Sequence, residues 1–260
     1  NKNSYFTDKE IDPENNPRDP GEYNFFNSFG FDGAKGDYIA YKCNIQPNLP
    51  SSRLSDVNSG LINPLFAGGT LSVVVDAQTS LDFTLEDVSG NAIDNGGFKF
   101  DLKGVFSGDG GIVFKGEGVS TLFGANTYLG ETVVEEGTLK LGSSKGIPQA
   151  SKVLIKSAAT LDLDGQSPTI DSITLSGGAG SGTLAQIIAG TATVKGGPLT
   201  VANAITSKGG LLSGISGVDV NVESGRTFIR DMKSETSLGT IKVNGGQLWV
   251  ASRDKNNNVQ

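Results

Sequence analysis

The chain has 260 residues and a formal net charge of −7, with no histidine and a single cysteine, Cys43. The lack of histidine excludes Ser-His-Asp, Cys-His and histidine–metal sites, and one thiol cannot form an internal disulfide. The acidic charge offers no attraction to nucleic acid, and no stretch approaches the roughly 20 apolar residues of a membrane-spanning helix. We therefore expect no cofactor, no metal, no nucleic-acid partner and no insertion into a membrane.

Residues 1–60 differ from the rest of the chain, because they are rich in proline, asparagine, aspartate and aromatic side chains. The stretch from Pro17 to Gly21 indicates a turn, and a strand is predicted around Tyr38–Tyr41. We predict an irregular cap or linker that folds against the end of the following unit, since repeat arrays need atypical terminal units. Gly33 to Ile39 partly resembles a calcium-binding nonapeptide, but such sites need several stacked copies.

Residues 61–260 consist of short strands separated by glycine, asparagine and aspartate. A three-residue pattern recurs along this stretch: a small residue, then Thr or Ser, then Leu. The associated leucines lie 17 to 23 residues apart: Leu81, Leu102, Leu122, Leu139, Leu161 and Leu184. A drifting period near twenty is typical of a parallel β-helix, in which each coil buries its inner face only by stacking on its neighbours. The pattern predicts an all-β solenoid of nine or ten coils.

Alternation within the strands predicts which side chains face the interior. The residues expected inside are Leu139, Leu141, Leu161, Leu163, Ile173 and Leu175, and those expected outside are Lys140, Asp162, Asp164 and Thr174. Thr132 and Val134 are expected to share one face of their strand, opposite to Glu131, Val133 and Glu135. Glycines at the corners permit the positive φ that a sharp turn requires.

Residues 108–142 carry the most specific pattern in the chain. It includes Gly110-Gly111, Asn126-Thr127-Tyr128, Gly130, Gly137-Thr138-Leu139 and Leu141-Gly142. This stretch closely resembles the passenger-associated repeat of bacterial autotransporters, and residues 61–250 are compatible with that family. The resemblance implies a right-handed parallel β-helix that is secreted or displayed at the cell surface of a Gram-negative bacterium by type V secretion.

The same resemblance implies a C-terminal outer-membrane β-barrel as a partner, and this chain does not contain it. Several relatives in the family carry a subtilisin-like protease ahead of the repeat, which this chain also lacks. Because the chain starts at Asn1 without methionine, we expect it to be a piece of a longer protein.

Three carboxylates, Asp162, Asp164 and Asp171, are the candidates for catalysis. Paired carboxylates about 5–9 Å apart hydrolyse glycosidic bonds, so a carbohydrate-active β-helix is one alternative. The competing interpretation is that they form the polar face of an amphipathic strand, as do Glu135-Glu136 and Asp82, Glu86 and Asp87. We favour the second interpretation and assign no catalytic, cofactor or metal residue.

The remaining polar and aromatic candidates have structural interpretations. Asn126 is expected to hydrogen-bond neighbouring backbone at a corner, where Tyr128 packs. Most of a group of phenylalanines are expected to fill the early core: Phe98, Phe100, Phe106, Phe114 and Phe123. Trp249 is expected to be partly exposed, either for ligand contact or near the end of the core. Three arginines could meet acidic partners but do not cluster in sequence: Arg226, Arg230 and Arg253.

The sequence therefore favours a non-catalytic stalk that presents an effector or adhesive region outside the outer membrane. Direct binding of a host-cell ligand by this segment, as an adhesin or toxin fragment, is the other alternative.

Overall fold

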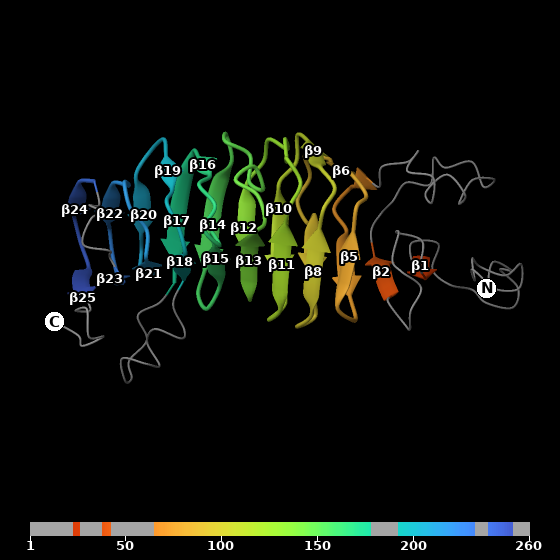
Figure 1. The fold of residues 1–260 in the computed structure, drawn as a ribbon, viewed down its shortest axis with the longest axis horizontal. Coiled ribbons are helices and arrows are strands. Elements are labelled where there is room, and N and C mark those ends of the chain that lie inside the picture. The colour runs from red at the N-terminus through yellow and green to blue at the C-terminus, as the bar shows by residue number, and fades with distance from the viewer. Residues whose placement is uncertain (1–22, 27–37, 43–64, 178–191, 232–238, 252–260) are drawn as a thin grey trace, which may run out of the picture.

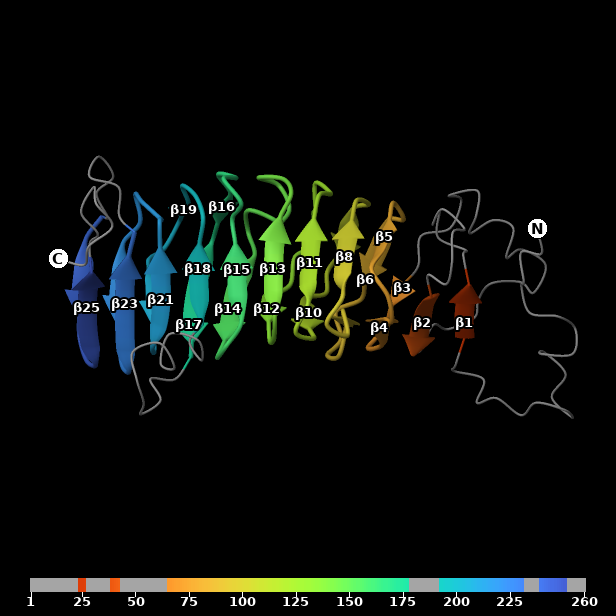
Figure 2. The same ribbon diagram turned by 60° about the horizontal axis from the view of Figure 1, so that its bottom comes forward.

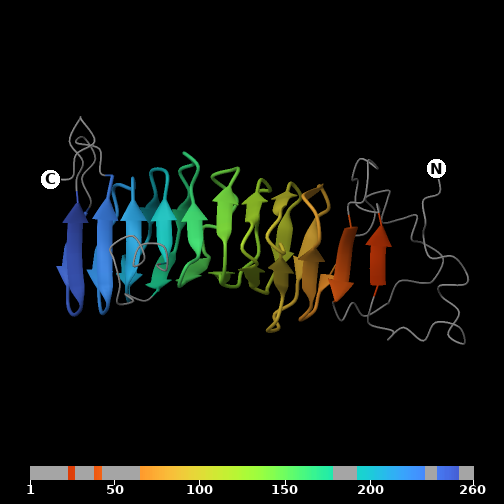
Figure 3. The same cartoon turned by 90° about the horizontal axis from the view of Figure 1, so that it is seen from below.

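The computed structural model describes residues 23–26, 38–42, 65–177, 192–231 and 239–251. The described part is built of β-strands, which stack side by side along one long axis (Figure 1). Two long sheets run the length of this stack. Figures 2 and 3 show the strands of the nine-stranded sheet as a row of arrows that point the same way.

The eleven-stranded sheet contains the following strands in spatial order: β1 (Tyr23–Phe26), β2 (Tyr38–Lys42), β4 (Thr70–Val73), β7 (Ala92–Asp94), β10 (Ile112–Lys115), β12 (Thr132–Val134), β14 (Lys152–Lys156), β17 (Ser172–Ser176), β20 (Ile205–Ser207), β22 (Val220–Val222) and β24 (Ile241–Val243). The nine-stranded sheet contains β5 (Ala77–Thr79), β8 (Lys99–Leu102), β11 (Val119–Leu122), β13 (Thr138–Leu141), β15 (Thr160–Asp162), β18 (Thr193–Lys195), β21 (Gly210–Ser213), β23 (Arg226–Arg230) and β25 (Gln247–Ala251).

Short strands form a third side on some coils. One small sheet contains β3 (Leu65–Phe66), β6 (Phe83–Leu85) and β9 (Phe106–Gly108), and another contains β16 (Thr169–Ile170) and β19 (Thr200–Val201). Each coil thus gives one strand to each long sheet before it advances. From β4 onward the strands pair in parallel, which confirms the predicted parallel β-solenoid of stacked coils.

The nine strands of the nine-stranded sheet are joined by about eight turns, so the described stack has nine coils, at the lower end of the nine or ten expected. The leucine spacing holds from Leu102 to Leu122, which are register partners 20 residues apart. It shifts at Leu122, whose next partner is Leu141, and it fails after Leu161, whose partner is Val194, 33 residues away. Leu184 lies outside the described residues.

The core lies between the sheets as continuous ladders of apolar side chains. One ladder in the eleven-stranded sheet is fully buried and links six successive coils: Leu71, Ile93, Phe114, Val134, Ile155 and Leu175. All six residues predicted to face the interior are buried, and Thr132 and Val134, predicted to share one face, are buried with them. The alternation therefore identified the inner face correctly, because a period of two places every second side chain on the same side.

The predicted strand near Tyr38 is confirmed as β2, which pairs antiparallel with β4 through Ile39 and Val73. Strand β1 in turn pairs antiparallel with β2. The parallel stack therefore meets antiparallel strands at this end. The boundary at residue 60 stays a prediction, because most of residues 1–64 lies outside the described part. No helix in the described ranges is long and apolar enough to cross a bilayer.

Corner glycines serve two physical purposes. Gly137 has a φ of 62°, the left-handed conformation that the sequence predicted for a corner. Gly124 has a different role, because a Cβ there would lie 1.9 Å from the carbonyl oxygen of Gly104 on the preceding coil. The coils approach so closely at this point that a side chain on Gly124 would push them apart.

We expect Gly124→Ala to lower the free energy of unfolding by about 2–3 kcal/mol, the upper range for overpacking. Gly165→Ala is the control: Gly165 has a φ of 78° and nothing within 4 Å of an added Cβ. That variant should lose only the strain of a left-handed alanine, about 1 kcal/mol. Urea denaturation followed by far-UV circular dichroism gives both values, and equal losses would contradict the close-approach explanation.

Candidate functional site

The outer face of the nine-stranded sheet carries most of the candidate residues. Its side chains alternate with the buried ones, and register places four charged residues and one threonine in a row across successive coils: Asp101, Thr121, Lys140, Asp162 and Lys195. Neighbouring strands in such a sheet lie about 4.8 Å apart, so side chains in one row touch. The row is therefore a surface on which opposite charges can pair between coils.

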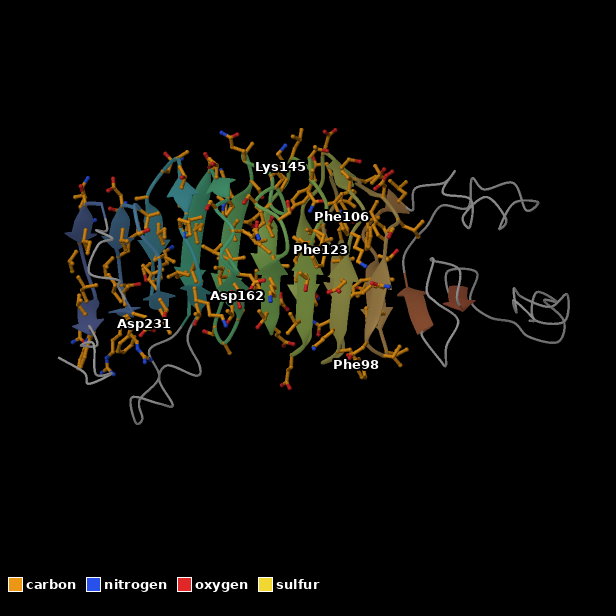
Figure 4. All side chains as sticks on the ribbon, in the orientation of Figure 1. Phe98, Phe106, Phe123, Lys145, Asp162 and Asp231 are labelled. Carbon is orange, nitrogen blue, oxygen red and sulfur yellow. The ribbon has the colours of Figure 1, made fainter. Side chains whose placement is uncertain are left out.

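Two ion pairs form in this region. Lys140 Nζ lies 2.9 Å from Asp164 Oδ2, and Lys195 Nζ lies 3.1 Å from Asp162 Oδ2. The hydrogen bond from Lys140 to Asp164 raises the pKa of the Lys140 ammonium above its usual value. Phe123 lies beside the row with 41% of its surface exposed and packs over Gly142 of the next coil (Figure 4). Together these groups line a shallow groove.

The raised pKa of Lys140 gives a pH-dependent prediction. The pKa of Lys140 is higher in the folded protein than in the unfolded chain, where it is about 10.4. The charged lysine therefore stabilises the fold fully below that unfolded pKa, and this stabilisation is lost as the pH rises through the folded pKa. Lys140→Gln should therefore cost at most about 1 kcal/mol at neutral pH, since the pair is solvent-exposed. The difference in Tm between the two proteins should shrink as the pH rises above about 10.4. A difference that grows over this range would contradict the assignment.

The three catalytic candidates all contact other groups of the chain. Asp162 and Asp164 lie two residues apart at the end of β15, where the Asp164 N–H donates to Asp162 Oδ1 (3.0 Å), and each carboxylate pairs with a different lysine. Asp171 precedes β17 in the other long sheet, and it accepts hydrogen bonds from Ser172 Oγ (3.1 Å) and Asn203 Nδ2 (3.1 Å). The polar-face interpretation therefore fits all three.

Two of the other acidic candidates, Glu135 and Asp82, bind groups of a neighbouring coil. Glu135 forms an ion pair with Lys156 of the next coil, and the hydrogen bond from this lysine lowers the pKa of the Glu135 carboxyl. Asp82 Oδ1 accepts the Val105 N–H (2.6 Å). Glu86 and Asp87 are exposed. In the described part of the chain, no group of three or more Asp, Glu, His or Cys residues could hold a metal ion.

Asn126 sits at the corner between β11 and β12 and joins three coils. Its Oδ1 accepts the Phe106 N–H (2.8 Å) of the preceding coil, and its Nδ2 donates to the Gly146 carbonyl oxygen (2.6 Å) of the following one. The side chain is buried. The structural role predicted for Asn126 is confirmed.

Tyr128 packs at the same corner, as predicted, and is buried. Its hydroxyl lies 2.6 Å from Thr132 Oγ1, which lies 3.0 Å from Ser151 Oγ. Burial raises the pKa of the Tyr128 phenol. The neutral hydroxyl is therefore fixed in a short chain of buried hydroxyl groups, in which each polar atom has a partner.

The phenylalanine prediction holds for three of five residues. Phe100, Phe106 and Phe114 are buried in the core, whereas Phe98 and Phe123 are 38% and 41% exposed (Figure 4). Phe98 lies in the corner between β7 and β8, and Phe123 follows the last residue of β11. Both fall outside the strands, where the alternation rule does not apply.

One row of outward residues was missed by sequence reasoning. Register aligns Leu211, Phe228 and Trp249 on the outer face of β21, β23 and β25, and Leu211 and Phe228 form an apolar cluster separate from the core. Trp249 is 50% exposed, as expected. The run Arg226-Thr-Phe-Ile-Arg230 lacks alternation at its centre, so the sequence alone could not show whether Phe228 or Thr227 points inward.

The same strand resolves part of the arginine prediction. Arg226 and Arg230 lie on either side of Phe228 at two-residue spacing, on one face of β23. The two arginines therefore do gather in space, although their spacing in the sequence gave little sign of it. Three other candidates lie outside the described residues: Arg253, Cys43 and the Gly33–Asp37 part of the calcium-like stretch.

These features define a parallel β-solenoid whose outer faces carry its paired charged groups. The chain is 32% identical over 190 residues to the adhesin BmaC autotransporter of Brucella suis biovar 1 (strain 1330). The match covers 72% of this chain and 5% of that protein. The chain is thus a distant, partial homologue of an autotransporter adhesin, and its β-solenoid fold is consistent with an autotransporter passenger. No family model matches the chain, and no solved structure is significantly similar to it.

Proposed function

We propose that this chain is a non-catalytic stalk of a surface-displayed autotransporter, which holds an effector or adhesive region away from the outer membrane. The similarity to an autotransporter adhesin supports surface display in a Gram-negative bacterium. Because the chain corresponds to 5% of the length of that relative, a C-terminal barrel as its partner is part of the proposal.

The observation that carries the stalk role is the continuous stack of coils. Each coil adds about 4.8 Å to the length, and the ladder from Leu71 to Leu175 runs through the core without a break. The cross-coil contacts of Asn126 and the ion pairs of Lys140 and Lys195 act between neighbouring coils. Such a stack separates its two ends at a fixed distance, which is what a spacer requires.

The proposal is tested by display on whole cells. The chain is placed between an epitope at its N-terminal side and an autotransporter barrel, and antibody binding to intact Gram-negative cells is measured. We expect the epitope to be accessible on intact cells and removable by added protease. An epitope that reacts only after cell lysis, while another passenger on the same barrel is displayed, would overturn the proposal.

A second candidate, direct binding of a host-cell ligand, is favoured by two observations. The relative is named as an adhesin, and Trp249 is half exposed on β25 beside β23, which carries Arg226 and Arg230. Tryptophan and arginine are enriched among residues that dominate binding energy at interfaces. Saturable binding of the isolated chain to host cells supports this role, and binding that rises linearly with concentration rejects it.

A further inference from the structure

We propose that the outer face of β23 and β25 carries a binding site for an acidic saccharide. The site consists of five residues, which we call the Trp249 platform: Arg226, Phe228, Arg230, Gln247 and Trp249. The inference deepens the proposed adhesive role and depends on that role for its biological setting. The binding itself is a property of this chain and can be tested without display.

The aromatic part of the platform is a pair of side chains in tilted contact. Phe228 and Trp249 are register partners on adjacent strands, and their ring centroids lie 5.9 Å apart with a tilt of 43°. Phe228 is 5% exposed and packs beside the indole, whereas Trp249 presents half of its surface to solvent. An aromatic side chain held in this way offers a rigid apolar surface at low cost in conformational entropy.

Gln247 fixes the orientation of two neighbours. Its Oε1 accepts a hydrogen bond from Arg226 Nε (3.2 Å) and another from Trp249 Nε1 (3.4 Å). The guanidinium and the indole are therefore positioned relative to each other before any ligand binds. Such preorganisation reduces the entropy that association would otherwise cost.

The charge of the platform is opposite to that of the whole chain. In a chain with a net charge of −7, two arginines flank the aromatic pair, and neither forms an ion pair with a carboxylate among the described residues. The nearby Asp231 carboxylate accepts a hydrogen bond from Ser213 Oγ (2.6 Å), and Figure 4 shows Asp231 at this end of the stack. The available guanidinium groups match a carboxylate or sulfate in planar, bidentate geometry.

Two other cations of the same sheet face are paired within the protein. Lys140 on β13 and Lys195 on β18 form ion pairs with Asp164 and Asp162. Among the described residues, no such ion pair joins Arg226 or Arg230 to a carboxylate. On β23 and β25 the aromatic surface and the two guanidinium groups therefore coincide.

A saccharide fits this combination better than an acidic peptide. The platform lies on the face of the sheet, and a pyranose ring can lay its apolar C–H face on the exposed indole while a carboxylate at its edge reaches an arginine. An extended peptide would instead be expected to pair its backbone with a strand edge. The arrangement therefore points to a uronic-acid or similarly acidic sugar as the ligand.

Trp249 is the sole tryptophan of the chain, so its fluorescence reports directly on the site. Titration of the whole chain with a galacturonic acid tetrasaccharide should change the emission in a saturable way, and calorimetry should give the same Kd. A neutral galactose tetrasaccharide should bind at least about tenfold more weakly, because it lacks the charged hydrogen bonds.

Variants locate the binding on the platform. Trp249→Ala, measured by calorimetry, and the double variant R226Q/R230Q should each weaken binding at least about tenfold. Lys242→Gln is the matched control, because Lys242 is an exposed cation of the same coil on the other long sheet. It should leave the Kd unchanged, and circular dichroism should show that all variants keep the native fold.

Three outcomes would overturn the proposal: no saturable signal with the acidic tetrasaccharide, equal affinity for the neutral one, or a Kd that responds equally to Lys242→Gln and to R226Q/R230Q. Tighter binding of an oligoglutamate peptide would also overturn it and would assign the platform to a protein partner. None of these results bears on surface display, so failure of this inference remains distinguishable from failure of the stalk proposal.

Discussion

Phe106→Ala is expected to lower the free energy of unfolding by about 3–5 kcal/mol, the range measured for truncation of a buried aromatic side chain. Phe106 is 1% exposed in β9 and stacks on Phe83 with ring centroids 4.9 Å apart, while Phe83 contacts Phe66 at 5.5 Å. The variant removes the last ring of this three-coil aromatic ladder. It leaves a cavity that the rigid backbone of neighbouring coils cannot close.

Phe123→Ala is the matched control, because it removes the same atoms from a ring that is 41% exposed. It should cost less than about 1 kcal/mol, since a partly hydrated ring loses less transfer energy and leaves no enclosed cavity. Thermal and urea denaturation measure both variants. Similar losses at the two positions would show that the aromatic ladder does not contribute the energy assigned to it.

Asn126→Ala should cost about 3 kcal/mol, because it leaves two buried backbone groups without partners. The Phe106 N–H and the Gly146 carbonyl would both lose a hydrogen bond, and each unsatisfied buried group costs about 1–3 kcal/mol. Hydrogen exchange of the Phe106 amide gives a local measurement of the same contact. We expect its protection to fall more than that of amides several coils away.

Asn203→Ala is the matched control for Asn126→Ala. Asn203 also bridges two coils, since its Nδ2 donates to Asp171 Oδ1 (3.1 Å), but the contact is exposed to solvent. Water can replace the lost partner there, so the loss should stay below about 1 kcal/mol. If the two variants lost the same free energy of unfolding, burial of the Asn126 hydrogen bonds would not explain their contribution to stability.

The alternation of side chains was the most informative signal in the sequence. Leu139, Leu141, Leu161 and Leu163 were placed inside correctly, because within a strand the period of two leaves no other choice once one face is apolar. The register between coils was harder. Leu122 pairs with Leu141 rather than Leu139, since corners can gain or lose residues without disturbing the strands they connect.

The glycines show a second limit of sequence reasoning. A positive φ at Gly137 follows from the general behaviour of corners, but the need for glycine at Gly124 depends on the carbonyl of Gly104 one coil away. That contact exists only after the coils stack. A single sequence identifies both residues as glycine and cannot separate the two reasons.

The candidate site was predictable only in part, for a related reason. Trp249 was expected to be partly exposed, whereas no position was predicted for its partner Phe228. The strand shows no alternation at its centre, where Thr227, Phe228 and Ile229 are all buried. Thr227 faces inward because its hydroxyl pairs with Ser207 Oγ (2.7 Å) of the preceding coil. A polar residue thus takes the inward position of the strand, and the phenyl ring of Phe228 lies on the outer face.

The direction of the hydrogen bonds in the solenoid has a mechanical consequence. Strands of successive coils lie side by side along the long axis (Figure 2), so the bonds that join them run along that axis. A force applied between the two ends would load these bonds in tension and open one coil at a time. Each released coil of about 20 residues would extend to roughly 65 Å in place of its ~4.8 Å rise. A tethered segment of this kind would therefore yield gradually under load, dissipating the work over many small ruptures.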